Sequence, residues 1–258
     1  MKYKYEIYNC NNGNPTAIIT NCTDEKIYKK LSEEIYKTNK NVDQVAVILD
    51  VKDNTCTFKL VNGEFCGNAC LSISAYMYNN YKTKDITIIN KIKKDNQEVD
   101  IEIKSIFNNN TGNLIIPKGL FLPNNKCTNL EDYKVEMNGI THYIIPKSYG
   151  DKNEEFARSK IQEMEENNTI KNILGIIFLE NNKIDPFIWI NRIKLLQHQD
   201  SCLSGSIAAL EYLETTNNIK ESDITQPTGE SYNIKFKENY IDITGTVRKV
   251  ESKILEVE

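Results

Sequence analysis

Two cysteines stand in similar local sequences nearly half the chain apart. Cys66 lies in the stretch FCGNACLSISAY, and Cys202 lies in the stretch SCLSGSIAALEY. In each stretch the cysteine precedes small or polar residues, and an apolar run with helical spacing follows and ends in a tyrosine. The pattern predicts two cysteines that each sit just before the start of a helix.

A cysteine at a helix start has distinctive chemistry because the thiolate is its reactive form. A free thiol has a pKa of about 8.5, and the unpaired N–H groups of a helix start stabilise the thiolate and lower that pKa. The same N–H groups suit a substrate carboxylate. Two such helix starts, placed face to face, would let one thiolate remove the α-proton of an amino acid while the other thiol protonates the opposite face. This inversion requires neither pyridoxal phosphate nor a metal.

The remaining cysteines are expected to be structural. The chain has seven cysteines and two histidines, without the tightly spaced ligand pairs of a zinc site. An odd count also speaks against a complete disulfide framework. Buried packing therefore explains the others best, and Cys70 lies one turn inside its helix. The four remaining packing cysteines are Cys10, Cys22, Cys56 and Cys127.

Composition excludes several other classes of function. The net charge is −4, so there is no basic surface of the kind that binds nucleic acids. No apolar run reaches the roughly 18 residues of a membrane span, and MKYKYEIYNC lacks the apolar core of a secretion signal. We therefore expect a cytoplasmic protein with free thiols. A length of 258 residues suits one large domain or two half-size lobes.

Strand patterns dominate the sequence, and helices are few. Helices are expected at 24–39, 69–81, 154–167 and 204–217, of which the second and fourth follow the two cysteine turns. The expected strands occupy 4–10, 44–51, 55–61, 85–92, 99–106, 112–117, 133–139, 141–146, 173–180, 183–193, 232–239 and 240–258. The fold class predicted from this order is α+β.

The block EFCGNA, together with the later Cys-x-Ser-Gly turn, resembles the diaminopimelate epimerase-like superfamily of two-cysteine racemases and epimerases. Within it, the chain is most similar to the cofactor-independent histidine racemases that serve opine metallophore synthesis. Four further stretches match that group in order: NNGNPTAII, THYIIP, TQPTGESYNIKF and ITGTVRKVESKILEVE. The resemblance covers nearly the whole chain, and EFCGNA is its most specific part.

The resemblance implies a fold of two pseudo-symmetric lobes with the active site in the cleft between them. Each lobe would be a curved, mostly antiparallel sheet around a central helix. Residues 1–115 would form the first lobe, to which the last strand pair can return, and residues 116–258 would form the second. Relatives often dimerise, so a homodimer is compatible with this picture.

The resemblance also assigns the site residues. Cys66 and Cys202 would be the two acid/base groups, and Glu64 would orient the first cysteine or handle its proton. Binding residues would contact the α-carboxylate and amino group of an amino-acid substrate, while no metal or cofactor takes part. These binding residues are Asn14, Gly67, Asn68, Ser204 and Gly205, and His142 is also expected to line the cleft.

Three departures from the family pattern bear on the function. Leu203 follows the second cysteine where relatives carry glycine, and a leucine would be strained there if the position needed a positive φ. Arg192 lies out of register with the Glu-Arg pair of true diaminopimelate epimerases. Gln199 stands where an acidic residue is expected, with Asp200 after it.

Several hypotheses remain open from the sequence. A histidine racemase leads, diaminopimelate epimerase is the alternative enzyme, and a relative that binds amino acids without catalysis is the third. Phenazine-type isomerases share the fold but work without the cysteine pair. A protease-like Cys202 with His142 or His198 would leave Cys66 unexplained. Each histidine also has a structural reading, as a packed strand residue and as an exposed loop residue respectively.

Overall fold

The computed structural model describes residues 1–94, 97–121, 133–137, 140–146, 153–167, 173–191 and 194–257. The chain forms two compact units. Unit 1 comprises Met1–Ile116 and Asp242–Glu258, and unit 2 comprises Pro117–Ile241. The end of the chain therefore returns to the first unit. It does so as one long strand, β15 (Tyr240–Glu256), and not as the predicted strand pair.

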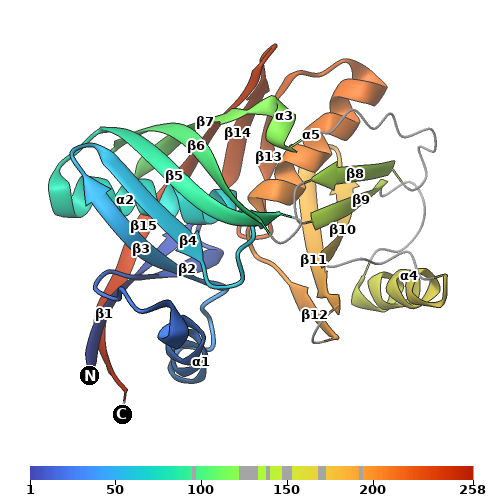
Figure 1. The fold of residues 1–258 in the computed structure, drawn as a ribbon. Coiled ribbons are helices and arrows are strands. Elements are labelled where there is room, and N and C mark those ends of the chain that lie inside the picture. Colours follow the sequence, from blue (N-terminus) through green and yellow to red (C-terminus); the bar gives the residue numbers. More distant parts are fainter. Residues whose placement is uncertain are drawn as a thin grey trace. The chain divides into compact units, whose positions relative to one another are not determined.

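Unit 1 is built from strands that close into a ring. The strand order is β1-β2-β3-β4-β5-β6-β7-β15, and β15 also pairs with β1, so both chain ends lie side by side (Figure 1). Most neighbours are antiparallel, whereas β2–β3 and β4–β5 are parallel. The strands are β1 (Lys2–Cys10), β2 (Asn14–Ile19), β3 (Gln44–Lys52), β4 (Thr55–Leu60), β5 (Asp85–Lys94), β6 (Gln97–Asn108) and β7 (Thr111–Pro117).

Helix α2 (Gly67–Tyr81) is the interior helix of unit 1. Its residues from Gly67 to Met77 are all buried, and it contacts β1, β2, β5 and β6. A helix that is apolar or small on every face must be enclosed, which explains its composition. Helix α1 (Tyr28–Thr38), preceded by a 3-10 turn (Glu25–Ile27), instead covers the outside of β3. Its Leu31 and Ile35 are buried there, and Ile27 packs against the same core cluster.

Unit 2 repeats the use of one enclosed helix. The strand order is β14-β13-β11-β10-β9-β8, with β12 on β11. Helix α5 (Leu203–Asn217) contacts β8, β9, β10, β11, β13 and β14. Helix α4 (Glu154–Glu166) lies against β11 (Figure 1). The remaining elements are α3 (Lys118–Phe121), β8 (Tyr133–Met137), β9 (Ile140–Pro146), β10 (Ile173–Glu180), β11 (Lys183–Ile190), β12 (Leu195–His198), β13 (Glu221–Thr225) and β14 (Ser231–Phe236).

The element predictions miss three strands and one short helix. Strands β2, β12 and β13 and helix α3 were not expected. The sequence of β13, ESDIT, has one buried residue, Ile224, so it lacks the apolar–polar alternation that predicts a strand. The chain turns between β3 and β4, with Asp53 at a φ of 53°. Cys127 and Arg192 lie outside the described residues.

Candidate active site

Cys66 is the residue that caps α2. It has an extended backbone, with a φ of −143° and a ψ of 117°, and the helix begins at Gly67. The predicted turn between cysteine and helix is therefore absent, and the cysteine itself is the N-cap. Its side chain makes no capping hydrogen bond. The residue as a whole is only partly buried, although protein atoms surround its sulfur. The turn that leads into this segment contains Gly63, whose φ of +80° favours glycine.

The Cys66 thiol is harder to ionise than its position at a helix start suggests. Burial raises its pKa to about 12, and the negative charge of Glu64 acts in the same direction. The backbone amides of Ala69 and Asn68 lower the pKa, as a helix start should. Burial outweighs them, so the net direction is opposite to that expected from the helix start alone.

Gln44, at the start of β3, links the first cysteine to another predicted site residue. Its side-chain amide favours the Cys66 thiolate, and its Nε2 donates to Asn14 Oδ1 at 2.8 Å. Asn14 itself is 2% exposed. The structure thus brings Asn14, Gln44 and Cys66 together within unit 1. Sequence reasoning missed Gln44, although a polar residue at the head of an apolar strand was a usable signal.

The other predicted residues of unit 1 are near the start of α2. Gly67 and Asn68 are buried in its first turn, and the Asn68 carbonyl accepts a hydrogen bond from Cys10 Sγ at 3.2 Å. Glu64 lies two residues before the cap, close enough for its charge to act on Cys66. Cys10, Cys22, Cys56 and Cys70 are buried, which confirms their expected burial.

Cys202 is the N-cap of α5, with a φ of −136° and a ψ of 100°. Here the sulfur does cap the helix, because the Gly205 N–H donates to Cys202 Sγ at 3.3 Å. Ser204 Oγ lies 3.6 Å from the same sulfur. Cys202 is 3% exposed. The second cysteine is therefore more enclosed than the first and has defined hydrogen-bonding neighbours.

Gln226 fixes the backbone of the second helix start. Its Oε1 accepts from the Cys202 N–H at 2.8 Å, and its Nε2 donates to Ser206 Oγ and to the Ile224 carbonyl, both at 2.9 Å. Ser206 Oγ in turn donates to the Cys202 carbonyl at 2.7 Å. Gln226 is 3% exposed. It belongs to the stretch TQPTGESYNIKF, but sequence reasoning gave it no role.

Leu203 is not strained. It is the first residue of α5 and is 2% exposed, and it is absent from the residues with positive φ. The glycine that matters is Gly205, because a Cβ there would lie 2.9 Å from Ile177 Cδ1 and 3.1 Å from Cys202 Sγ. A side chain at this position would push on the thiol.

The two histidines have different environments. His142 on β9 is fully buried, and its Nε2 lies 3.0 Å from Ser204 Oγ. Burial lowers its pKa to about 3. His198 lies on β12 rather than in a loop, with its Nε2 2.5 Å from Asp185 Oδ1. This hydrogen bond raises the His198 pKa. His198 is therefore paired with Asp185, whereas His142 contacts Ser204 beside the second cysteine.

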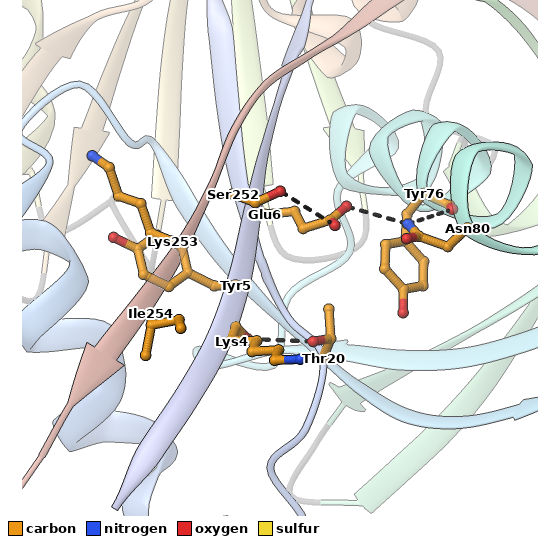
Figure 2. A pocket seen from close by; sticks show the side chains of 9 residues that line it. All are labelled: Lys4, Tyr5, Glu6, Thr20, Tyr76, Asn80, Ser252, Lys253 and Ile254. Carbon is orange, nitrogen blue, oxygen red and sulfur yellow. Dashed lines mark hydrogen bonds between the residues drawn. The ribbon is translucent and has the colours of Figure 1, made fainter.

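A pocket of about 680 Å³ lies elsewhere in unit 1. Figure 2 shows Glu6 among the lining residues, hydrogen-bonded to Asn80 and Ser252, with Tyr76 and Ile254 also lining the pocket. None of the predicted site residues lines it. Within the described ranges, no group of three or more His, Cys, Asp or Glu residues is arranged to hold a metal. No helix in those ranges is long and apolar enough to cross a membrane.

Comparison with solved structures shows the fold. A phenazine biosynthesis protein of the PhzF family from Enterococcus faecalis has a TM-score of 0.66 at 14% identity, with 100% of both chains covered. A predicted epimerase from Pseudomonas aeruginosa has a TM-score of 0.68 at 9% identity, covering 99% of this chain and 100% of that one. The chain therefore has the fold of these proteins.

Comparison of sequences shows the family. A histidine racemase of Fusobacterium nucleatum subsp. nucleatum is 29% identical over 247 residues, covering 89% of this chain and 88% of that protein. A histidine racemase of Staphylococcus aureus strain Mu50 is 23% identical over 235 residues, covering 84% and 83%. Residues 6–253 match the model of the histidine racemase CntK N-terminal domain. The chain belongs to this family of histidine racemases.

Proposed function

We propose that this protein is a histidine racemase that inverts the α-carbon without a cofactor, with Cys66 and Cys202 as its two acid/base groups. The observation that carries the proposal is that each cysteine caps an enclosed helix of its own unit. Two helix starts with cysteine caps supply the two proton-handling groups that an inversion needs. The relatives that match over most of the chain are named histidine racemases.

The steps follow from the chemistry of the two sulfurs. One thiolate removes the α-proton from one face of histidine, and the other thiol donates its proton to the opposite face. Each sulfur ends in the protonation state in which the other began, so the reverse reaction uses the same pair. The backbone amides at the two helix starts stabilise the carboxylate as negative charge builds up on it. We assign these contacts to Gly67 and Asn68 in unit 1 and to Ser204 and Gly205 in unit 2.

The raised pKa of Cys66 has a role in this scheme. With a pKa of about 12, the thiol stays protonated at neutral pH while the site holds no substrate. The ammonium group of a bound amino acid is a positive charge, and a positive charge within about 4–6 Å lowers a thiol pKa. Substrate binding therefore shifts the Cys66 thiol toward the thiolate, the form that acts as the base. Asn14, held by Gln44, is placed near Cys66 and is our candidate for contacting the substrate, and Glu64 is our candidate for orienting the thiol.

The wider architecture in this proposal is that of two pseudo-symmetric lobes, each a curved sheet around its helix. The enclosed positions of α2 and α5 support it. A cytoplasmic location suits a mechanism that needs both thiols reduced. A homodimer is the proposed assembly. The binding-only alternative loses its main support, since Leu203 is an ordinary helical residue.

The test is a racemisation assay with L-histidine, read by chiral chromatography, beside LL-diaminopimelate and a panel of L-amino acids. We expect D-histidine to form, and single Cys66→Ser and Cys202→Ser variants to lose about 10²- to 10⁴-fold in rate. Cys70→Ala, four residues beyond the first cap, is the matched control and should keep its rate. If the protein converted diaminopimelate but not histidine, diaminopimelate would be assigned as its substrate instead. Full activity of either cap variant would exclude the two-base mechanism.

A further inference from the structure

His142 occupies a site that closely fits a neutral imidazole. It lies in the middle of β9, opposite Gly175 of β10 and Val135 of β8. A Cβ at position 175 would lie only 2.0 Å from His142 Nδ1, so the ring can occupy this space only because residue 175 is glycine. Burial keeps the ring uncharged, with a pKa of about 3.

The two ring nitrogens differ in their surroundings, which selects a tautomer. Nδ1 is buried and has no hydrogen-bond partner among the described residues, while Nε2 lies 3.0 Å from Ser204 Oγ. A proton on Nδ1 would be a buried donor without an acceptor, which is costly. A proton on Nε2 has the serine oxygen as its acceptor. The favoured form therefore carries its proton on Nε2 and donates to Ser204.

Ser204 then has its own proton to donate. A hydroxyl has one donor and two acceptor positions, and one acceptor position is used by His142 Nε2–H. Cys202 Sγ lies 3.6 Å from Ser204 Oγ and 3.3 Å from the Gly205 nitrogen. A thiolate at position 202 would thus accept from a hydroxyl and from a backbone amide. Hydrogen bonds to the charged form of a group favour that form.

We infer that His142 and Ser204 form a relay of hydrogen bonds, Nε2–H to Oγ and O–H to Sγ, that stabilises the Cys202 thiolate. Both are positioning residues: His142 acts through Ser204, and Ser204 acts through the sulfur. The inference rests on the proposed function, because it serves Cys202 as an acid/base group. It also gives Ser204 a role toward the sulfur beyond the expected contact with substrate.

The relay can be tested without any racemase activity. Iodoacetamide alkylation of the intact protein is followed at each cysteine by mass spectrometry across a range of pH. The rate at the high-pH plateau reports access to the sulfur, and the midpoint pH reports its ionisation. We expect Ser204→Ala to raise the Cys202 midpoint by about one pH unit or more. The pH profile of alkylation at Cys66 in the same sample should not change.

Matched variants separate the relay from general disturbance of the helix start. Ser204→Thr retains the hydroxyl and should restore the wild-type midpoint. Ser206→Ala removes a hydroxyl that bonds the Cys202 carbonyl rather than its sulfur, and it should leave the midpoint unchanged. His142→Gln keeps an amide donor and should shift the midpoint less than His142→Leu.

The outcomes distinguish this inference from the proposed function. An unchanged Cys202 midpoint in Ser204→Ala, or an equal shift at Cys66, would overturn the relay even if the protein racemises histidine. A shift confined to Cys202 and reversed by threonine would support the relay even if histidine proved not to be the substrate. The Ser204 variants decide the question on their own if substitutions of the buried His142 do not fold.

Discussion

The two helix starts are each capped by a cysteine but have different surroundings. Cys66 is partly exposed, makes no capping hydrogen bond and has Glu64 nearby. Cys202 is buried, accepts from the Gly205 amide and lies beside a serine that contacts His142. Each start also has a glutamine, but Gln44 acts on the first sulfur and Gln226 on the backbone of the second. The first sulfur is influenced by the Gln44 amide and the Glu64 carboxylate, whereas the second accepts from the Gly205 N–H and lies beside the Ser204 hydroxyl.

The largest difference in racemisation rate between the two helix starts is expected from substitutions at the third residue after each cap. This residue is Ala69 in α2 and Gly205 in α5. Gly205→Ala places a Cβ about 3 Å from Cys202 Sγ and from Ile177, which displaces the thiol. A displacement near 1 Å costs about 10²-fold in rate, measured as kcat for racemisation.

The converse substitution is the control. Ala69→Gly removes a methyl group where no capping bond constrains the sulfur, so it should cost only about 1 kcal/mol of helix stability and little activity. If Gly205→Ala kept full activity, the sulfur contact would have no catalytic importance and the two starts would be equivalent in this respect.

The next effect concerns the two glutamines. Gln226→Leu leaves the buried Cys202 N–H without its acceptor, so unfolding in urea should show a loss of about 1–3 kcal/mol. Gln44→Leu removes the donor to Asn14 and should lower kcat more than stability. The reverse pattern, in which Gln44 governs stability and Gln226 only the rate, would contradict the roles assigned to them.

A pH effect on stability follows from His142. Its pKa is about 3 in the folded protein and about 6.5 when unfolded, so the unfolded chain takes up a proton first as pH falls. Its contribution is complete above about pH 6.5 and is lost progressively toward pH 3. Between pH 7 and pH 5 wild type should lose about 2 kcal/mol from this group. Urea titrations of His142→Gln should lack this part of the loss.

The smallest effect concerns the reactivity of Cys66 in the substrate-free protein. Because burial raises its pKa to about 12, alkylation at Cys66 should keep accelerating from pH 7 to pH 10. An ordinary exposed thiol, half ionised at about pH 8.5, would slow its acceleration above that pH and reach a plateau near pH 10. A plateau there at Cys66 would show that the helix start dominates burial after all.

The sequence locates the two cysteines and their helices, but it does not identify the side chains that surround the two sulfurs. The two cysteine turns and the enclosed helices are readable because small apolar residues at helical spacing leave a strong local pattern. Gln44 and Gln226 were missed because a lone glutamine has no pattern until a partner from a distant strand reaches it. The pKa of Cys66 was misjudged because a sequence shows the helix start but not how much protein buries the sulfur. The concern about Leu203 disappeared once the helix was seen to begin at that residue.

The measurement that tests the central claim most directly is NMR of the α-proton of L- and D-histidine in D2O with wild type and each cap variant. Wild type should exchange the α-proton of both enantiomers as it racemises them. Cys66→Ser should retain exchange on one enantiomer only, and Cys202→Ser on the opposite one only. Loss of the same enantiomer's exchange in both variants, or racemisation by either variant at the wild-type rate, would contradict the assignment of one cysteine to each face of the substrate.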